Sequence, residues 1–335
     1  MEPGAELVPH TYELSDTCPP GYVDLAIKFC GICGSDVHQI EDSWGVASFP
    51  LVPGHEIVGE IVAVGDGETR LAVGDRGAIG TQRSNCGACG NCHGGAENVC
   101  KDITKTYAGP NKDKGGFASH IRYPTDWVFK SPPALDSKYV GPLMCAGITT
   151  YSPLKRHAKA GDRVGVIGIG GLGHLALQFG KAMGYDMVAF SNMPGEKEVA
   201  VAKAFGASEF VVVGEDPNVD AAKGSFDMIL NTASARVPLD PYFDLLKPHG
   251  TMACVSLPDK AEKSQLFMQA IVPTEKALVG SYLGPHADYE EMLAFALEHN
   301  VRPQVEVMPI QEINEAVTRV REGKARYRVV LDMAA

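Results

Sequence analysis

The sequence predicts an α/β protein in which a doubly wound parallel sheet is combined with a β-rich domain. Three observations support this prediction. The chain has 335 residues, enough for about two domains. Its first third contains short β patterns separated by turns, and strand and helix patterns alternate between residues 163 and 256. This alternation indicates parallel strands, because each connection between neighbouring parallel strands must be long enough to hold a helix.

The β-rich part is predicted from three short apolar segments. Residues 23–29, 57–64 and 117–122 have the length and composition of strands, and turn-forming pairs such as Pro53-Gly54 separate them. We therefore expect a compact β-rich domain in the first third of the chain.

From about residue 143 the pattern changes to helices and buried strands. Short apolar runs predict strands, and apolar residues at helical spacing predict the helices between them. Two helices and a last strand are expected near the C-terminus. In chain order the predicted elements are strand 163–167, helix 172–183, strand 187–190, helix 196–205, strands 210–213 and 228–230, helix 242–247, strand 251–256, helices 288–298 and 310–322, and strand 327–332.

Composition and charge argue against several functional classes. Apolar residues make up 45% of the chain and charged residues only 21%, which is typical of a globular protein with sizeable cores. The 41 acidic residues outnumber the 30 lysines and arginines, and the net charge of −11 disfavours nucleic-acid binding. No apolar run reaches the roughly 18 residues that span a bilayer, and the first ten residues lack a secretion signal. We expect a cytoplasmic protein that binds neither nucleic acid nor membrane.

Four cysteines lie in one short loop with the spacing C-x2-C-x2-C-x7-C. Cys86, Cys89, Cys92 and Cys100 alternate with glycines, which let the backbone turn so that four thiolates can face one ion. In a chain without a secretion signal, nine cysteines suggest metal or catalytic roles before disulfides. We predict a structural zinc site. A disulfide pair and an iron–sulfur cluster are the alternatives, although the usual ferredoxin spacing is missing.

A glycine-rich turn follows the predicted strand 163–167 and opens the next predicted helix. Glycines at these positions permit a tight turn and let a pyrophosphate approach the backbone at the positive end of the helix. A lone motif of this kind is weak, but the strand-turn-helix context strengthens it. We predict dinucleotide binding by Gly168, Ile169, Gly170, Gly171, Leu172 and Gly173.

A second set of possible metal ligands is dispersed along the chain. Cys33, His55, Glu56 and Cys145 are each weak signals, because a lone cysteine is more often a core residue and a lone histidine is more often satisfied by hydrogen bonds. Their joint order, with the four-cysteine loop between His55 and Cys145, is more specific than any one of them.

In this order, the motifs resemble those of the zinc-dependent medium-chain alcohol dehydrogenases, and the resemblance covers nearly the whole chain. The cinnamyl alcohol dehydrogenase branch is most similar, through residues 53–59, 145–154 and 326–328. The resemblance implies a GroES-like catalytic domain formed by residues 1–146 and 284–335, and a Rossmann domain formed by residues 147–283. It also implies a homodimer.

The resemblance further implies two zinc ions per chain. Cys33, His55 and Cys145 would hold a catalytic zinc, with Glu56 as a nearby or alternating ligand and an open position for substrate. Two thiolates and one imidazole suit Zn²⁺. The ion would polarise an aldehyde carbonyl or lower the pKa of an alcohol.

Three polar residues near Cys33 take family positions. Ser35 would bridge the substrate oxygen and the cofactor ribose, and His38 would act as a distal proton relay; a turn hydroxyl and a surface histidine are the alternatives. Asp36 would fix the tautomer of a histidine ligand.

Cofactor preference is predicted from the end of the second Rossmann strand. An acid at that position holds the ribose of NAD, whereas this chain has Ser191, followed by Asn192 and, further on, Lys197 as a possible phosphate partner. We therefore predict NADP(H) over NAD. By the same resemblance, the remaining cofactor residues are Thr149, Thr232, Ser256, Ser281, Tyr282, Leu283 and, at the pyrophosphate, Arg326.

The substrate is expected to be a small alcohol or aldehyde, aromatic or of medium length. Trp44, Val46 and Lys105 occupy pocket positions where monolignol enzymes have other residues, which argues against a dedicated monolignol site. Gly34 replaces a histidine of the branch and resembles polyol dehydrogenases, but Cys145 favours the alcohol type. The alternatives are therefore a polyol or secondary-alcohol dehydrogenase and, in another class, a catalytically silent dinucleotide-sensing protein on the same fold.

Overall fold

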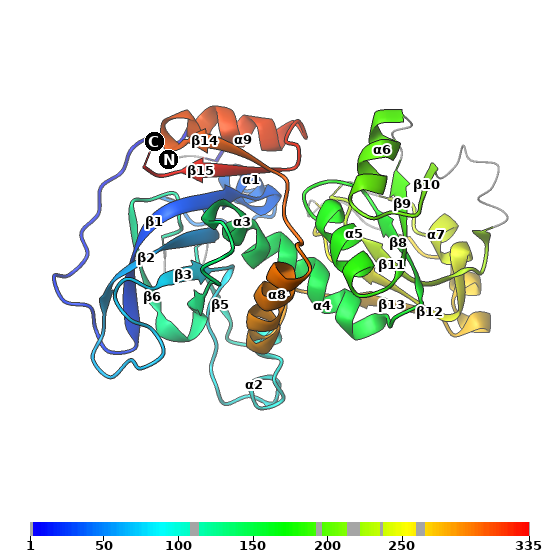
Figure 1. The fold of residues 1–335 in the computed structure, drawn as a ribbon, viewed down its shortest axis with the longest axis horizontal. Coiled ribbons are helices and arrows are strands. Elements are labelled where there is room, and N and C mark those ends of the chain that lie inside the picture. Colours follow the sequence, from blue (N-terminus) through cyan, green and yellow to red (C-terminus); the bar gives the residue numbers. More distant parts are fainter. Residues whose placement is uncertain are drawn as a thin grey trace. The chain divides into compact units, whose positions relative to one another are not determined.

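The computed structural model describes residues 3–107, 114–191, 196–212, 222–234, 237–258 and 265–334. The chain divides into two compact units. The first comprises Met1–Cys145, Gly284–Leu297 and Pro303–Ala335, and the second comprises Ala146–Leu283 and Glu298–Arg302. Both chain ends belong to the first unit, which is drawn mostly in blue and cyan and in orange and red in Figure 1.

A seven-stranded sheet forms the framework of the first unit. Its central strand β1 (Tyr22–Ile32) pairs antiparallel with β2 (Glu56–Val64), β6 (His120–Pro124) and β15 (Arg328–Asp332). The two chain ends are therefore joined through the backbone hydrogen bonds of one sheet. The sheet is completed by β3 (Arg76–Ile79), β7 (Phe129–Lys130) and β14 (Val305–Pro309), and β4 (Gln82–Ser84) and β5 (Thr104–Lys105) form a separate ribbon.

Helices α1 (Gly34–Glu41) and α9 (Ile313–Arg321) pack together against the end of this sheet. Each fully buried aliphatic side chain stabilises the fold by about 1.5–3 kcal/mol. This packing fixes α1, whose first turn carries several of the predicted site residues. The cluster contains Ile32, Val37, Ile40, Ala316, Val317, Val329 and Leu331. The other helices of the unit are α2 (Gly90–His93), α3 (Ser137–Pro142) and α8 (His286–Glu298), whose last residue lies in the second unit.

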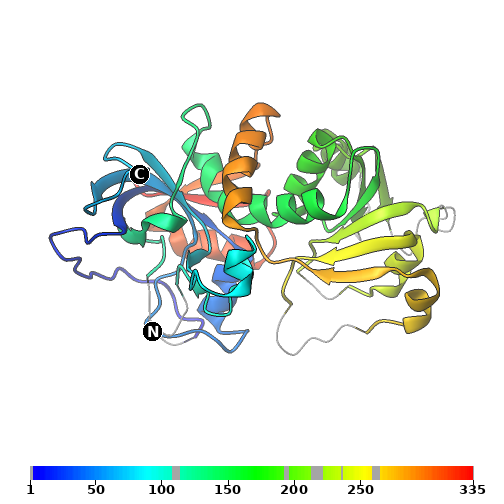
Figure 2. The same ribbon diagram turned by 90° about the horizontal axis from the view of Figure 1, so that it is seen from below.

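The second unit is built on a six-stranded parallel sheet with the order β10-β9-β8-β11-β12-β13. The order reverses at β8, and ligands of such sheets bind at the carboxyl ends of the strands near this reversal. Helix α5 packs on β8 and β9. Figure 2 shows the green helices of this unit beside its yellow strands. The elements are α4 (Ile148–His157), β8 (Arg163–Ile167), α5 (Gly173–Ala182), β9 (Asp186–Ser191), α6 (Glu196–Ala204), β10 (Glu209–Val212), β11 (Phe226–Asn231), α7 (Asp240–Leu245), β12 (Leu246–Cys254) and β13 (Ala277–Gly280).

The α/β architecture predicted from the sequence is confirmed, with local differences. The helix predicted at 242–247 ends at Leu245, because Leu246 already belongs to β12 and pairs with Phe226 of β11. Strand β13 was not predicted, since it is short and alternates between half-buried and exposed residues. Helix α1 was also not predicted, because its eight residues follow β1 almost directly.

The boundary near residue 300 differs from the one predicted. Residues 298–302, which the sequence analysis assigned to the domain of the chain ends, belong to the second unit. The side chain of Gln178 in α5 explains this, because it donates to the carbonyl of Arg302 and accepts from its N–H, both at 3.0 Å. Ala146 likewise lies in the second unit. Among the described helices, none has the length and hydropathy needed to cross a membrane.

Candidate functional site

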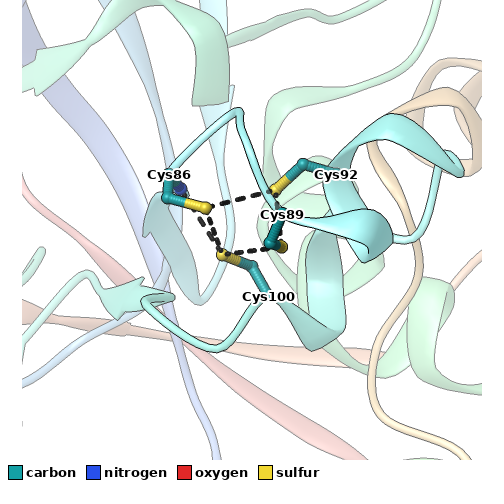
Figure 3. A group of neighbouring side chains, drawn as sticks. All are labelled: Cys86, Cys89, Cys92 and Cys100. Atoms are coloured by element: carbon teal, nitrogen blue, oxygen red, sulfur yellow. Dashed lines mark hydrogen bonds between the residues drawn. The ribbon is translucent and has the colours of Figure 1, made fainter.

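The four-cysteine loop brings its sulfur atoms together around one point (Figure 3). The Sγ–Sγ distances are 3.5 Å for Cys86–Cys100, 3.6 Å for Cys89–Cys92, 3.8 Å for Cys89–Cys100 and 4.0 Å for Cys86–Cys92. Thiolates bound tetrahedrally at about 2.3 Å from one zinc ion lie about 3.8 Å apart. The loop therefore fits one tetrahedral ion, and none of its cysteines is in a disulfide.

Hydrogen-bond donors around this loop favour thiolates. The backbone N–H of Asp102 lies 3.3 Å from the Sγ of Cys100, and the side-chain amide of Asn85 lies 3.3 Å from the Sγ of Cys92. A hydrogen bond from the backbone of Cys92 lowers the pKa of the Cys89 thiol to about 6. At Cys100 the hydrogen bond from the backbone of Cys86 lowers the pKa, but desolvation and the thiols of Cys86 and Cys92 outweigh it and raise that pKa to about 11. Because the thiolate is the form that binds metal, a cation at the centre of the loop would replace the protons that the four sulfur atoms share.

The second cluster is assembled from three separate segments of the first unit. Cys33 is the N-cap of α1, His55 directly precedes β2, and Cys145 lies in the π-helical turn Leu143–Gly147 after α3. Together with Glu56 these residues are buried, and their ligand atoms all lie within 4.8 Å of one another. The fold thus joins the dispersed residues that the sequence analysis singled out.

The geometry of this cluster also fits zinc. The Sγ atoms of Cys33 and Cys145 are 3.9 Å apart, and the Nε2 of His55 lies 3.3 Å from the Sγ of Cys145. A tetrahedral zinc site requires about 3.8 Å between two thiolates and about 3.5 Å between a thiolate and an imidazole nitrogen. Three such ligands leave a fourth position open, which is typical of catalytic sites.

Buried charge makes the cluster attractive to a cation. Hydrogen bonding to Cys145 holds the pKa of the Cys33 thiol well below its usual value. Burial alone lowers the pKa of His55, but the charge and hydrogen bond of Asp36 outweigh it and raise that pKa to about 10. Negative groups that hold a proton this strongly in a buried site also favour a divalent ion in its place.

Glu56 is the one carboxylate in this cluster. Its carboxylate forms an ion pair with the guanidinium of Arg328 in β15, and both groups are buried. Gly31 makes this position possible, because a Cβ there would lie 2.0 Å from Oε2 of Glu56. Neither carboxylate oxygen has a hydrogen bond of good geometry. One of its oxygens nevertheless lies within 4.8 Å of the ligand atoms of Cys33, His55 and Cys145.

Ser35 and His38 lie on the same face of α1, three residues apart. The hydroxyl of Ser35 lies 3.7 Å from the Sγ of Cys33, which places it beside the metal ligands. The Nδ1 of His38 lies 2.7 Å from the hydroxyl of Ser43. The hydroxyl of Ser43, which the sequence analysis did not single out, is therefore hydrogen-bonded to one of the two predicted relay residues.

The three predicted pocket residues have different environments. Trp44 stacks on the His38 ring, with 4.6 Å between ring centroids and 18° between planes. Val46 is 57% exposed. Lys105 lies opposite Gln82 in the β4–β5 ribbon, and burial lowers the pKa of its amine. Of the three, Trp44 is in direct contact with a predicted site residue.

The glycine-rich turn has the conformation that its sequence predicts. Gly168 has a φ of +83°, which favours glycine, and its N–H bonds to the carbonyl of Phe190 in β9. A Cβ on Gly173 would lie 2.0 Å from the carbonyl oxygen of Gly168. No side chain caps the start of α5. The N–H groups of His174 and Leu175 already donate to the carbonyls of Gly170 and Leu172, so a phosphate at this end would meet the N–H groups of the glycine-rich turn that precede His174.

Most predicted cofactor residues lie at the carboxyl ends of the parallel strands. Gly168, Ser191, Thr232, Ser256 and Ser281 end or follow β8, β9, β11, β12 and β13 in turn. One common edge of the sheet therefore presents a row of small and polar groups.

Two of these hydroxyls serve the protein itself. The hydroxyl of Thr232 donates to the carbonyls of Ile167 and Gly168, at 2.9 and 2.8 Å, and so braces the glycine-rich turn. The hydroxyl of Ser256 donates to the carbonyl of Thr232 at 2.9 Å. Since a hydroxyl has one proton, neither group can also donate to a cofactor.

The other predicted cofactor residues are more scattered. Thr149 is buried in α4, and Tyr282 and Leu283 follow Ser281, with Leu283 at a φ of 51°. Asn192 and the side chain of Lys197 lie outside the described residues. Arg326 is in the first unit, and its guanidinium donates to the carbonyls of Gly323 and Ala325.

Sequence reasoning missed three residues of the site. Arg328 could have been noticed as an arginine within an apolar strand, since a buried arginine needs a buried partner. Ser43 and Tyr107 carry no such signal. The hydroxyl of Tyr107 donates to Asp36, but only the fold brings them together.

Two known protein families match this chain. The family described as "Alcohol dehydrogenase GroES-like domain" matches residues 19–133, and the family described as "Zinc-binding dehydrogenase" matches residues 171–298.

Individual relatives match over most of their length. A probable cinnamyl alcohol dehydrogenase of Oryza sativa is 39% identical over 92% of this chain and 86% of its own, and a mannitol dehydrogenase of Petroselinum crispum is 38% identical over 93% of this chain and 94% of its own. A cinnamyl alcohol dehydrogenase structure from Sorghum bicolor has a TM-score of 0.93 and 36% identity, covering 98% of this chain and 95% of its own. The structure of CAD from Helicobacter pylori in complex with NADP(H) has a TM-score of 0.86 and 30% identity, with coverages of 95% and 92%.

Proposed function

The chain belongs to the zinc-binding medium-chain alcohol dehydrogenases, in the branch of the cinnamyl alcohol dehydrogenases, and we propose that it transfers hydride between NADP(H) and a primary alcohol or aldehyde. The observation that carries this proposal is the buried Cys33–His55–Cys145 cluster, whose Sγ–Sγ and Nε2–Sγ distances suit an open zinc site. A catalytically silent dinucleotide sensor would not need these ligands together with Ser35 beside them.

The residues of the cluster would hold the catalytic zinc and orient the substrate oxygen. When bound, zinc supplies a Lewis acid that polarises a carbonyl oxygen or stabilises an alcoholate. Cys33, His55 and Cys145 provide three protein ligands, so the substrate oxygen has one defined direction of approach. Their burial excludes water from the reacting oxygen.

A chain of polar side chains would carry the proton of the alcohol. Ser35, beside Cys33, accepts a proton from the substrate oxygen while it passes its own proton on. His38, three residues further along α1, would be the next acceptor on that face. The hydroxyl of Ser43, 2.7 Å from His38 Nδ1, would extend the route beyond His38. This hydroxyl can both donate and accept, as a relay requires.

The second unit would bind NADP(H) along the carboxyl edge of its sheet. The pyrophosphate is expected at the start of α5, where the glycine-rich turn exposes backbone N–H groups. Ser191 at the end of β9 brings no negative charge, so a 2′-phosphate is not repelled there. The Helicobacter pylori relative in complex with NADP(H) supports the same preference.

A polyol dehydrogenase is the second candidate function. It is favoured by Gly34, and the Petroselinum crispum relative named mannitol dehydrogenase is 38% identical to this chain. An aromatic or medium-length aldehyde remains our first choice, because Cys145 completes the ligand set and Trp44 adds a large apolar surface beside His38.

We also propose a homodimer. Strand β13 is at the edge of the sheet of the second unit, where its outer backbone groups can pair with another strand. Leu278 in β13 is 43% exposed, and Phe267, Met268 and Val272 are exposed apolar residues of the preceding segment. Light scattering should give twice the chain mass, and Leu278→Arg should give the chain mass.

The proposed function is tested by following NADPH and NADH oxidation with aromatic, aliphatic and terpenoid aldehydes, and NADP⁺ and NAD⁺ reduction with a polyol panel. Fast reduction of aromatic or medium-length aldehydes by NADPH is expected. A clear preference for polyols would favour the second candidate. No turnover of any substrate by a protein that holds two zinc ions would contradict both.

A further inference from the structure

Asp36 is the hub of the hydrogen bonds behind the proposed catalytic zinc. Its carboxylate is fully buried. Oδ2 accepts from the N–H of Cys33 at 2.8 Å, while Oδ1 accepts from the N–H of Gly54 at 3.0 Å and meets the Nδ1 of His55 at 3.1 Å. A further hydrogen bond to Oδ1 comes from the hydroxyl of Tyr107. Every donor except Tyr107 belongs to a metal ligand or to its neighbour in sequence.

We infer that Tyr107 is a positioning residue for the zinc ligand His55 and acts through the carboxylate of Asp36. Its ring lies beside the His55 imidazole, with 5.8 Å between centroids, and the two planes differ by 30°. The hydroxyl lies 3.4 Å from His55 Nδ1. Tyr107 is thus the side chain that touches both Asp36 and His55 from outside the ligand-bearing segments.

Tyr107 is anchored independently of the cluster that it touches. The preceding residue, Thr106, donates its N–H to the carbonyl of Thr81 at 2.9 Å, and its hydroxyl bonds to the carbonyl of Gly80 and to the hydroxyl of Tyr123. Thr106 is fully buried. The position of the Tyr107 ring is therefore set by the β4 region and not by His55.

The count of protons gives this contact its effect. Tyr107 has one hydroxyl proton and donates it to Oδ1 of Asp36, so it cannot also donate to His55. Because the carboxylate of Asp36 can only accept, the Nδ1 of His55 must carry a proton and donate it to the same oxygen, which leaves the lone pair on Nε2, 3.3 Å from the Sγ of Cys145. Tyr107 adds a hydrogen bond to Oδ1 beside those from Gly54 and His55, and so restrains the rotation of the carboxylate. Such groups behind a metal ligand fix its tautomer and its orientation.

This inference rests on the proposed role of Cys33, His55 and Cys145 as zinc ligands, and metal release tests both. The full-length zinc protein is mixed with a chromogenic chelator, and two release phases are expected. A Cys145→Ala variant, which should retain only the phase of the four-cysteine loop, identifies them. Tyr107→Phe should release zinc from the second phase about 10- to 100-fold faster, with the loop phase unchanged.

The matched control is Tyr289→Phe. Tyr289 is buried as Tyr107 is, with 0% and 5% of their surfaces exposed, and it donates to the side chain of Gln82, so this variant loses a buried hydroxyl away from Asp36. It should release both zinc ions as the wild type does. Equal release from Tyr107→Phe and Tyr289→Phe would overturn the inference and leave the proposed function standing, whereas a wild type with only the loop phase would overturn both.

The absorption spectrum of the cobalt-substituted protein gives a second measurement, which reports on the geometry of the metal site and not only on whether the protein is folded. In Tyr107→Phe the d–d absorption bands of the Cys33–His55–Cys145 site should shift relative to wild type, and in Tyr289→Phe they should not. If Tyr107→Phe does not fold, 3-fluorotyrosine at position 107 keeps the shape of the ring and strengthens the donor. A stronger donor should shift the cobalt bands relative to wild type, in the direction opposite to the shift that a weaker donor would cause. Unchanged bands would contradict the inference.

Discussion

The candidate sites of the two units are built from different groups: side chains in the first unit and mainly backbone groups in the second. In the first unit, side chains from separate segments converge on one buried point, and Asp36 and Arg328 support them from behind. In the second unit, the glycine-rich turn offers backbone N–H groups, and the hydroxyls of Thr232 and Ser256 are bonded to carbonyls of the protein itself. Substitutions in the first unit should therefore abolish a function, whereas side-chain changes along the sheet edge of the second should tune one.

The largest effect is expected from Cys145→Ala. This change removes one of the three proposed zinc ligands in a buried site, and the loss of several kcal/mol of Lewis-acid stabilisation corresponds to a rate loss of roughly a thousandfold or more. Metal analysis should fall from two equivalents to one, and kcat/KM should fall with every substrate. Two equivalents in the variant, or one in the wild type, would contradict the assignment.

The matched change in the other proposed zinc site is Cys89→Ser. Because that loop offers four thiolates, an ion bound there would have no position for substrate, and its loss should destabilise the protein without changing the chemistry of the remaining site. A lower thermal midpoint is expected, with kcat of the folded fraction within a few-fold of wild type. Loss of kcat comparable to that of Cys145→Ala would remove the distinction between the two clusters.

How far the sequence predicts each site depends on how local it is. The Cys86–Cys100 loop and the turn at Gly168 each lie within a short segment, so spacing alone indicates the chemistry. Cys33 and Cys145 are 112 residues apart, and they could be joined only through a resemblance to a family. Arg328 could have been noticed as an arginine in an apolar strand, but its partner Glu56 could not, and Tyr107 carries no signal at all, because its contact with Asp36 is created only by the fold. Strand β13 was not predicted because its four residues are too few to show a recognisable apolar pattern.

A backbone effect is expected from Gly173→Ala in the second unit. The added Cβ would lie 2.0 Å from the carbonyl oxygen of Gly168, so the glycine-rich turn must move. Overpacking of this kind costs about 1–3 kcal/mol, which corresponds to roughly 5- to 150-fold in affinity. Titration of intrinsic fluorescence should show NADP and NAD weakened by the same factor, with zinc content unchanged. Weakening of only one cofactor would show that the turn does not bind the shared pyrophosphate.

A smaller and selective effect is expected from Ser191→Asp. A carboxylate at the end of β9 repels a 2′-phosphate and accepts a hydrogen bond from a 2′-hydroxyl, so the preference should move from NADP toward NAD. One charge-assisted contact is worth about 1.5–3 kcal/mol, or roughly one to two decades in the ratio of kcat/KM values. Lys197→Ala should weaken NADP and leave NAD unchanged. A wild type that already uses NAD more efficiently would contradict the assignment of this position.

The smallest effect is expected from Trp44→Ala, which tests whether the first unit also contains a tunable wall. Trp44 stacks on His38, and its indole nitrogen is buried without a hydrogen-bond partner, so it could shape the substrate pocket or simply support the His38 ring. An aromatic contact of this kind is worth about 0.5–1.5 kcal/mol, roughly two- to tenfold in kcat/KM. If Trp44 lines the substrate pocket, cinnamaldehyde and coniferaldehyde should lose this factor and hexanal should not, because only large side groups contact the ring in the transition state.

If Trp44 instead supports the His38 ring, all substrates should lose activity equally, and Trp44→Phe, which restores a stacking ring, should recover it. The measurement is kcat/KM with NADPH for these aldehydes and benzaldehyde. In the wild type, an exclusive preference for coniferaldehyde would contradict our expectation from Trp44, Val46 and Lys105 that this is not a dedicated monolignol site.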